Sequence, residues 1–323
     1  MTTPTILTVI LNWRTPDLTL QAAEATLPQM AELGGEIVIV DNDSGDGSFE
    51  TMSAAVAERG WDAGGRVRVL QSGHNGGFGA GNNFGMRQGL SSGAAPDYYF
   101  ILNSDAWPEP GAIAALLATL EARPDAGMAG SYIRGPDGEP HQTAFRFPSI
   151  ASEFESAVQT GPVSRLLNRW IVALPLPETE TEVDWCAGAS VLMRRTMLDE
   201  IGSFDETFFL YFDETDLCLR AARAGWKVIY VPHSEVVHIG SVSTGMKRWQ
   251  RTPGYWFDSR RHYFVKNHGQ LYWAAATLAH LAGGLGWRLR CALSNRPHGM
   301  PDRFLNDLYR HSARALTRRA PQS

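Results

Sequence analysis

The chain has 323 residues, of which 44% are hydrophobic and 20% charged, as is ordinary for a globular protein with a sizeable core. Its three cysteines, Cys186, Cys218 and Cys291, are too few and too scattered for a disulfide framework or a cysteine zinc site. They suit a reducing compartment. The opening MTTPTILTVILNW lacks a basic segment and a cleavage site, so we expect no signal peptide and a cytoplasmic location.

The net charge of −5 hides an asymmetry along the chain. From Met246 onward there are 14 Lys and Arg against 3 Asp and Glu, whereas the first 245 residues hold 15 and 31. An acidic body with a basic tail favours an anionic surface or ligand near the tail. A solvated basic helix would explain the same charges.

The first part of the chain alternates strand-like and helix-like segments. Residues 6–13 are apolar and rich in β-formers, residues 18–33 have the apolar spacing of a helix, and residues 36–41 form a second apolar run. Strand, helix and parallel strand make a βαβ unit, whose ligands gather beyond the carboxyl ends of the strands. Asp41 follows the second strand, where it would suit a base or ribose contact. The loop DNDSGDGS equally fits a plain turn or helix cap.

A glycine-rich turn follows the next predicted strand, at 66–71. The sequence GHNGGFGAGNNFG then leads into a helix, and it matches neither a Walker loop nor a good GxGxxG motif. Close backbone approach beside a helix N-terminus suits a phosphate, and Asn75, Asn82 and Asn83 add neutral donors. A purely structural glycine turn is the alternative.

The hydrophobic strand predicted at 97–103 ends in Asn103-Ser104-Asp105. An acid at the end of a buried strand is well placed to hold a divalent cation, which would neutralise a diphosphate. A helix cap explains Asp105 equally well. Further along, residues 127–149 predict strands around a turn, 150–180 predict a loop or short helices, and 182–206 predict a strand and a short helix.

Residues 204–216 combine five acids with five aromatic residues. The acids are Asp205, Glu206, Asp213, Glu214 and Asp216. Carboxylates beside apolar rings are costly to desolvate unless they are paired, liganded or used in chemistry. The cluster therefore needs a partner elsewhere in the chain. A helix-like segment follows it, and then a strand ending near His238.

The tail is aromatic, apolar and edged with basic residues. Its apolar run from Leu271 to Trp287 has 17 residues, which is marginal for a membrane span. A helix lying in the membrane interface fits better, with Tyr272, Trp273 and Trp287 near headgroups and Arg288 and Arg290 beside phosphates. A helix pair closing the body, or a dimer interface, is the alternative. Arg260 and Arg261 could also face a diphosphate.

Six motifs in order resemble the family 2 glycosyltransferases, in their rhamnosyltransferase-like branch. They are VILNWRTPDLT, IVIVDNDSGDGS, NGGFGAGNNFG, YFILNSDAWPEPG, VDWCAGASVLMRR and GSFDETFFLYFDETDLCLRAARAGWKVIYVPHSEVVHIGS, and together they cover residues 5–241. The resemblance implies an α/β protein with the GT-A fold. A Rossmann-like nucleotide-sugar half with a central mixed sheet (1–125) and an acceptor half (126–245) would form one catalytic domain, followed by a helical extension (246–323).

The resemblance also implies roles for single residues. The donor would be bound by Asn12, Trp13, Asp41, Asn75, Gly77, Asn82, Asn83, Asn103 and Ser104, and the acceptor by Trp185, Gly188 and Asp216. Asp105 and His238 would hold Mg²⁺ or Mn²⁺, although His238 could instead be a structural histidine at a strand end. Asp216 could instead be a helix-start acid.

The catalytic base is implied by the family's acidic pair, which is usually Glu-Asp. Here the order is swapped to Asp213-Glu214, so Glu214 stands in the base position and Asp213 is its alternative. One base suffices for a single displacement with inversion, because a carboxylate needs only to take the proton of the incoming hydroxyl.

The implied activity is inverting, metal-dependent transfer of a sugar from a nucleoside-diphosphate donor, with L-rhamnose from dTDP-rhamnose the first candidate. The acceptor would be a cell-envelope glycan or a polyprenyl-diphosphate-linked lipid, met at the inner face of the membrane through peripheral contact of the tail. The chain could form a homo-oligomer, and no nucleic-acid partner is expected. A nucleotidyltransferase would want a basic glycine-rich loop near the N-terminus, which RTPD is not. A non-catalytic carbohydrate-binding protein would not need both Asp105 and the Asp213-Glu214 pair.

Overall fold

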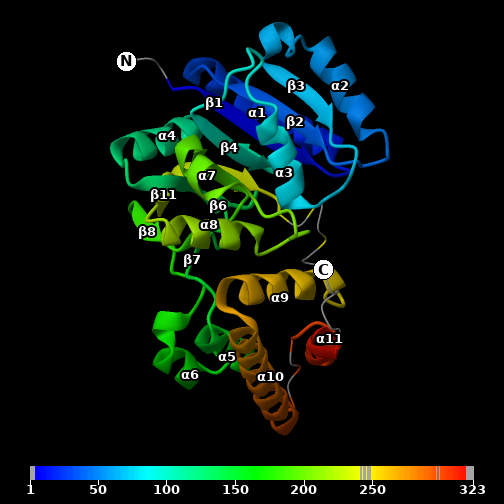
Figure 1. Cartoon of the computed structure of the whole chain (residues 1–323), viewed down its shortest axis with the longest axis vertical. Helices are drawn as coiled ribbons and strands as arrows, with labels where there is room; N and C mark the ends of the chain where they lie inside the picture. The colour runs from blue at the N-terminus through cyan, green and yellow to red at the C-terminus, as the bar shows by residue number, and fades with distance from the viewer. Residues whose placement is uncertain are drawn as a thin grey trace. The chain divides into compact units, whose positions relative to one another are not determined.

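The computed structural model describes residues 4–240, 242, 245, 249–295, 297 and 299–317 (Figure 1). The chain divides into two compact units: Met1–Phe145 with Ala173–Gly245, and Arg146–Val172 with Met246–Ser323. This corrects the predicted boundary in one respect. The division near residue 245 is present, but residues 146–172 belong with the C-terminal helices and not with the predicted acceptor half.

The first unit is built on a nine-stranded mixed sheet in the order β3-β2-β1-β4-β10-β6-β11-β5, with β8 pairing on β11. Its strands are β1 (Ile6–Asn12), β2 (Glu36–Asp41), β3 (Val67–Gln71), β4 (Tyr98–Asn103), β5 (Ala106–Pro108), β6 (Ala126–Arg134), β8 (Thr181–Val183), β10 (Ser190–Arg194) and β11 (Lys227–His238). The strands β3, β2, β1 and β4 run parallel, and β10 lies antiparallel between β4 and β6. A separate pair consists of β7 (Ala144–Phe145) and β9 (Trp185–Cys186).

Helices cover both faces of the parallel strands. The first unit contains α1 (Pro16–Leu33), α2 (Ser48–Glu58), α3 (Phe78–Arg87), α4 (Ala112–Ala122), α7 (Arg195–Ile201), α8 (Asp213–Arg223) and the short η1 (Ala63–Gly65). Successive strand residues point to opposite faces. The Thr8 hydroxyl contacts Met30 of α1, whereas Val9 lies against Gly85 of α3, so α1 and α3 cover opposite faces of β1.

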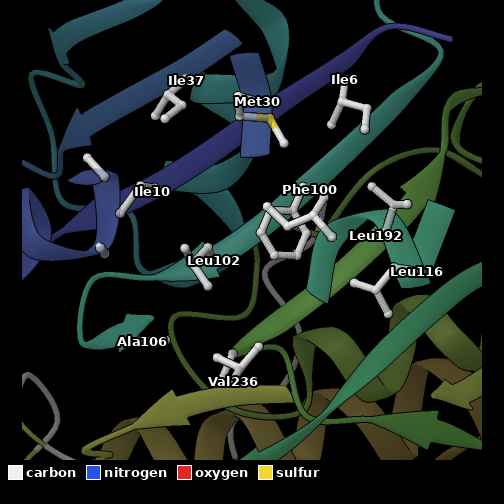
Figure 2. Close-up of a cluster of buried hydrophobic side chains, with 14 of the residues drawn as sticks. Ile6, Ile10, Met30, Ile37, Phe100, Leu102, Ala106, Leu116, Leu192 and Val236 are labelled. Carbon is white, nitrogen blue, oxygen red and sulfur yellow. The ribbon is translucent and has the colours of Figure 1, made fainter. Parts of the chain in front are cut away.

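Between these layers lies a continuous apolar core, shown in part in Figure 2. Ile10 of β1, Met30 of α1, Phe100 of β4 and Leu192 of β10 have no solvent exposure. Burying one such side chain stabilises the fold by about 1.5–3 kcal/mol. The core therefore fixes where the strands end, and so it also fixes the positions of the polar residues at those ends. The strands predicted at 6–13, 36–41, 66–71 and 97–103 and the helix at 18–33 are confirmed to within two residues.

The second unit is helical in its described residues. It contains α5 (Ile150–Val158), α6 (Gly161–Leu166), η2 (Asn168–Trp170), α9 (Gly254–His268), α10 (Gln270–Leu293) and α11 (Phe304–Thr317). None of the helices in the described part of the chain combines the length and the apolar character of a membrane span.

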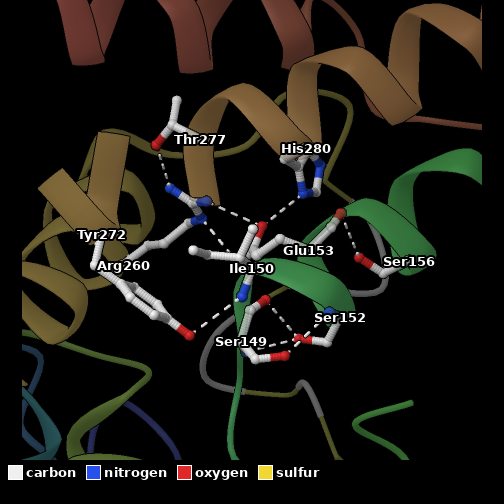
Figure 3. Close-up of polar contacts among 9 residues, drawn as sticks. All are labelled: Ser149, Ile150, Ser152, Glu153, Ser156, Arg260, Tyr272, Thr277 and His280. Atoms are coloured by element: carbon white, nitrogen blue, oxygen red, sulfur yellow. Dashed lines mark hydrogen bonds and ion pairs between the residues drawn. The ribbon is translucent and has the colours of Figure 1, made fainter. Parts of the chain in front are cut away.

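A buried ion network joins α5 to α9 and α10 (Figure 3). The Arg260 guanidinium donates from Nη2 to Glu153 Oε2 at 2.9 Å, His280 Nδ1 lies 2.7 Å from the same oxygen, and Arg260 Nη1 donates to Thr277 Oγ1 at 3.1 Å. Arg260 is 1% exposed. This network explains why residues 146–172 join the C-terminal unit. It also corrects the expectation that Arg260 faces a diphosphate, because its guanidinium is already occupied inside the unit.

Burial alone would raise the pKa of Glu153, but the charge of Arg260 and the hydrogen bond and charge of His280 outweigh it and lower the pKa to about 2. The charged form is therefore the one that stabilises the unit. This contribution is present above the usual pKa of 4.5 and is lost as the pH falls from there toward about 2.

We expect Glu153→Gln to lower the opening free energy of α9 and α10 by about 3 kcal/mol at pH 7, because it leaves a buried guanidinium without its counter-charge. Hydrogen exchange of these helices in the full chain measures the loss. The difference from the wild type should shrink below pH 4.5, where the wild-type carboxylate begins to lose its advantage. The control is Asp258→Asn, whose exposed carboxylate also pairs with a histidine, His311, and should cost less than about 0.5 kcal/mol. Equal effects of both substitutions would contradict a stabilising role for the network.

Candidate functional site

Polar residues end three neighbouring parallel strands of the sheet. Asn12 at the end of β1 pairs in register with Asp41 at the end of β2, and Leu11 pairs with Asn103 at the end of β4. The carboxyl ends of adjacent parallel strands share one edge, where α/β proteins bind ligands. The sheet therefore places Asn12, Asp41 and Asn103 side by side, as the sequence predicts.

Asp41 is 1% exposed and engaged within the chain. Its Oδ1 accepts hydrogen bonds from Asn12 Nδ2 at 2.8 Å and from the Ser44 hydroxyl at 2.6 Å. Asn12 Oδ1 in turn accepts from the Thr19 hydroxyl at 2.8 Å, which ties β1 to α1. These bonds fit the turn alternative for Asp41, and its contact with a nucleobase stays a prediction. Trp13 lies beside this network, with the Arg14 guanidinium 4.6 Å from its ring centroid.

The glycine-rich turn is held by side-chain amides. Asn75 Oδ1 accepts from the Gly77 amide and from Asn42 Nδ2, both at 3.0 Å, and Asn42 Nδ2 also reaches the Gly77 carbonyl at 3.2 Å. Gly77 has a φ of +92°, and a β-carbon there would lie 1.8 Å from the carbonyl oxygen of Phe209. The Phe78 amide donates to that same oxygen at 2.9 Å. Only glycine fits, because the turn abuts the backbone of the aromatic segment that precedes α8.

Two asparagines on α3 have different surroundings. Asn83 is bound at both ends: Nδ2 donates to the Phe204 carbonyl and to Glu206 Oε1, and Oδ1 accepts from the Phe204 amide. It clamps the loop before α8, so its geometry fits a structural role. Asn82 donates to the Phe78 carbonyl at 3.0 Å, whereas its Oδ1 is buried and has no hydrogen-bond partner among the described residues. That orphaned acceptor keeps Asn82 as a candidate ligand residue.

The strongest polar juxtaposition joins β4 to the end of β11. His238 Nε2 lies 3.0 Å from Asp105 Oδ1 and 3.3 Å from Asn103 Nδ2, and the Gly240 amide donates to Asp105 Oδ2 at 3.1 Å. Burial would raise the pKa of Asp105, but the hydrogen bond and charge of His238 outweigh it and hold that pKa below its usual value. The Ser104 hydroxyl lies 3.2 Å from the Thr15 hydroxyl, just before α1.

The donor set at this point fits a divalent cation. A carboxylate and a neutral imidazole bind such ions, and two adjacent ligands of an octahedral ion at its usual distances lie about 3 Å apart. Asp105 Oδ1 and His238 Nε2 have this separation. Within the described part of the chain, no group of three or more His, Cys, Asp or Glu side chains has the geometry of a complete metal site. Asp105 and His238 would thus leave the remaining positions to water or to a ligand's own oxygens.

The turn before β10 links this pair to the acidic helix. The Asn103 amide donates to the Ala189 carbonyl at 3.0 Å. A β-carbon on the next residue back, Gly188, would lie 3.2 Å from the ring of Phe78 and 3.8 Å from Glu214 Cβ. One short turn therefore touches the end of β4, the start of α3 and the start of α8. Three motifs far apart in the sequence meet around Gly188.

The backbone that leads into α8 is strained. Tyr211 and Phe212 have φ values of +68° and +65°, in the left-handed region that costs an ordinary residue about 1–2 kcal/mol. The next residue, Asp213, is 1% exposed, and its Oδ2 is buried with no hydrogen-bond partner among the described residues. Burial, and then the charge of Glu214, raise the pKa of Asp213 well above its usual value. Asp213 therefore favours the neutral form beside the partly exposed Glu214.

A family model described as "Glycosyltransferase like family 2" matches residues 4–264. The chain belongs to the family 2 glycosyltransferases. It is 32% identical over 304 residues to an N-acetylglucosaminyl-diphospho-decaprenol L-rhamnosyltransferase of Mycobacterium tuberculosis, covering 91% of this chain and 92% of that protein. This similarity supports the rhamnosyltransferase-like branch of the family.

Two solved glycosyltransferases share the fold. One is GalNAc-T7 with UDP, GalNAc and Mn²⁺, at a TM-score of 0.57 and 15% identity, covering 95% of this chain and 54% of that one. The other is the mannosyltransferase PcManGT of Pyrobaculum calidifontis with GDP-Man and Mn²⁺, at a TM-score of 0.54 and 16% identity, covering 98% and 88%. The predicted GT-A fold, with its mixed central sheet and C-terminal helices, is confirmed.

Two predicted acceptor residues of this family 2 glycosyltransferase lie in different surroundings. Trp185 on β9 stacks on Phe145 of β7, with ring centroids 4.0 Å apart, and remains partly exposed. Asp216 has no exposure and pairs with Arg220 at 2.9 Å, and the Arg220 guanidinium also donates to the carbonyls at the end of α7 and in the loop that follows it. The geometry thus favours the alternative for Asp216, a helix-start acid that anchors this loop.

Several residues of the site were not singled out from the sequence. Ser44 completes the Asp41 network, Phe78 lies against Gly188, and the ring of His141 lies edge-on to His238 with centroids 6.0 Å apart. For Ser44 the signal was local, since Asp-x-x-Ser is a common turn motif. His141 follows the GPDG turn, and nothing in the sequence relates it to a residue almost a hundred positions later.

We expect Gly77→Ala to destabilise the first unit by about 2 kcal/mol or more, because the methyl group adds a backbone clash to the left-handed strain. The matched control is Gly45→Ala, where φ is +66° but nothing lies within 4 Å of the added carbon. It should cost only the conformational strain, about 1 kcal/mol. Urea denaturation of both variants measures the difference. If Gly45→Ala costs as much as Gly77→Ala, the contact with Phe209 is unimportant.

Proposed function

We propose that this glycosyltransferase moves a sugar, with inversion, from a nucleoside-diphosphate donor to a hydroxyl of a lipid-linked cell-envelope glycan. L-Rhamnose from dTDP-rhamnose is the first candidate donor. The observation that carries the proposal is the Ala187–Ala189 turn, which brings the Asp105–His238 pair and Glu214 to the same part of the first unit. The M. tuberculosis relative, whose name specifies a diphospho-decaprenol substrate and L-rhamnosyl transfer, supports the choice of sugar and acceptor.

Donor binding is assigned to the carboxyl edge of the parallel strands. Asn12, Asp41 and Asn103 end the strands at that edge, and Trp13 and Ser104 directly follow two of them in the chain. The turn that contains Asn75 and Gly77 presents backbone amides at the start of α3, where a helix N-terminus favours the charge of a diphosphate. Asn82 and Asn83 stand on the first turns of the same helix.

Asp105 and His238 would hold a divalent cation. When bound, such an ion neutralises the charge that develops on the leaving diphosphate. Mg²⁺ strongly prefers oxygen ligands, so the imidazole favours Mn²⁺ over Mg²⁺. Asn103 lies within reach of the same histidine and would orient the ligand beside it.

Glu214 is the proposed catalytic base. It is the partly exposed member of the acidic pair, and it stands next to Gly188, in the turn that reaches the end of β4. The incoming hydroxyl gives its proton to Glu214 as its oxygen attacks the anomeric carbon, and the diphosphate leaves from the opposite face. A single base without a covalent intermediate gives inversion.

We expect Glu214→Gln to reduce kcat by about 10²–10⁴-fold, the range that general-base catalysis supplies, while the affinity for dTDP-rhamnose stays unchanged. The control is Asp213→Asn, which keeps the size of the buried neighbouring side chain and leaves the proposed base in place. It should retain activity within about tenfold. Steady-state kinetics with a soluble glycolipid analogue gives kcat, and calorimetry gives donor affinity. If Asp213→Asn lowered kcat more than Glu214→Gln, the base would be Asp213.

We expect Asp105→Asn to abolish the Mn²⁺-dependent part of dTDP binding. In the wild type, dTDP with Mn²⁺ at about 100 times its Kd should stabilise the folded state by about 2.7 kcal/mol, and EDTA should remove most of this gain. Thermal-shift measurements with and without EDTA test both points. The exposed Asp62 supplies the control, since Asp62→Asn should keep the full metal-dependent shift. An EDTA-insensitive shift in the wild type would exclude a metal role for Asp105.

A lipid-linked acceptor places the proposed reaction at a membrane surface. We therefore propose a cytoplasmic enzyme that meets the membrane peripherally through its C-terminal helices. Assembly into a homo-oligomer is compatible with this arrangement and is a separate question.

A further inference from the structure

One face of α10 exposes a row of leucines. Five large apolar side chains on this helix are between 61% and 89% exposed: Leu271, Leu278, Leu285, Leu289 and Leu293. The outward face of a helix packed on a soluble protein normally carries polar and charged residues. Isolated exposed leucines are common, but a contiguous row on one element marks an interaction surface.

The spacing of these leucines makes them a single stripe. At about 100° per residue, the four later leucines point within about 40° of the direction of Leu271. The stripe runs nearly the full length of the helix, about 33 Å at a rise of 1.5 Å per residue. We call these five residues the leucine stripe.

Packing of the opposite side fixes the stripe outward. Trp273, Ala276 and Cys291 are buried. Gly283 lies against α5, where an added β-carbon would be 2.7 Å from the Phe154 carbonyl, and Gly284 lies against Leu305 of α11. The inward His280 is held by Glu153. Because glycines let α10 approach its neighbours so closely, the helix cannot rotate to bury its leucines within the unit.

The tail residues that are available to a membrane differ from those expected from the sequence. Trp273, expected near headgroups, is 2% exposed and packs inside the unit. The Tyr272 hydroxyl accepts a hydrogen bond from the Ile150 amide, so it ties α10 to α5. The apolar surface lies on the leucines, which the sequence pattern alone did not separate from the buried residues.

Basic residues flank the stripe on both sides. Arg288 and Arg290 lie about 100° to either side of the direction of Leu271. The sequence from Gln270 to Leu293 contains no Asp or Glu. Leucines between two arginines match the layering of a membrane interface, with acyl chains beneath the apolar stripe and lipid phosphates level with the guanidinium groups.

We propose that the leucine stripe of α10 docks on a lipid bilayer containing anionic headgroups, with the helix lying in the plane of the interface. A second copy of the chain is the other occupant to consider. An isologous interface would bring the stripe of one copy onto that of the other, together with its arginines. Since α10 supplies no carboxylate to pair with those arginines, charge favours lipid phosphates over a second copy. This surface deepens the proposed function, on whose lipid-linked acceptor it rests for its role.

Vesicle sedimentation of the full chain tests the proposal without donor, metal or acceptor. The vesicles combine phosphatidylcholine with about one quarter phosphatidylglycerol, enough anionic lipid to attract a basic surface. We expect the wild type to bind and the double variant Leu278→Glu with Leu285→Glu to bind at least tenfold more weakly. Arg288→Gln with Arg290→Gln should weaken binding to these vesicles roughly tenfold and leave binding to pure phosphatidylcholine unchanged.

Leu166→Glu is the matched control, because Leu166 is 78% exposed on α6, outside the stripe. It should bind vesicles like the wild type, and circular dichroism should show unchanged melting for every variant. Unaltered binding of the leucine variant, or equal loss in Leu166→Glu, would overturn the proposal. So would a wild type that ignores vesicles and forms dimers that the leucine variant separates, which would assign the stripe to a second copy.

The outcome is independent of catalysis. Thermal shifts with dTDP and Mn²⁺ should be the same in the wild type and in the leucine variant, because the stripe belongs to the second unit and the donor residues to the first. A protein that binds vesicles but no nucleotide keeps the docking surface and loses the proposed function. If the protein binds nucleotide but no vesicles, the proposed function stands and the docking surface is ruled out.

Discussion

The candidate site depends on the insertion of one antiparallel strand between two strands that run the other way. The strand β10 pairs with β4 on one side and with β6 on the other. The turn that precedes it therefore reaches the carboxyl end of β4, where the Asn103 amide donates to the Ala189 carbonyl. Gly188 then lies between Phe78 and Glu214. If β10 shifted by one residue, its alternation would be reversed and this turn would be displaced from the acidic helix.

Strain and desolvation accumulate at the same place. Two consecutive aromatic residues adopt left-handed backbone conformations immediately before α8, and Asp213 is buried with an unpaired oxygen. Each feature costs free energy of order 1–3 kcal/mol, and the apolar core beneath the sheet offsets it. The Gly77–Phe209 contact and the Asn83 clamp hold the strained segment from the α3 side. Such strain is typical of functional sites, where the surrounding structure holds residues in conformations that a free chain avoids.

Local pattern predicted the strands, the first helix and the polar residues at the strand ends, because apolar periodicity and turn chemistry act over a few residues. It did not separate polar residues that bind other parts of the chain from those that are available to a ligand, because this difference depends on distant partners. Asn83 is occupied by a loop about 120 residues away, and Asp216 by Arg220 and the carbonyls that it binds. The same limit applies to residues 146–172, which join the second unit through the packing of α5 on α10 and through a buried pair between Glu153 and Arg260, 107 residues apart. The family resemblance supplied the order of the motifs, but not these contacts.

The second unit pairs some of its charges and exposes a row of leucines. Together these features indicate what kind of partner its surplus of basic residues would bind. Arg260 and Glu153 neutralise each other inside the unit, while Arg251 pairs with Asp307 and Asp258 pairs with His311. These pairs engage two of the three acids that follow Met246, so they leave a surplus of positive charge. Charge alone would suit any anionic partner, including nucleic acid. The leucine stripe of α10 narrows this choice, because an apolar row flanked by arginines matches a layered partner with phosphate above hydrocarbon. Composition thus indicated that the partner is negatively charged. The packing of α10, which buries its glycine side and exposes its leucines, indicates that this partner is a lipid surface.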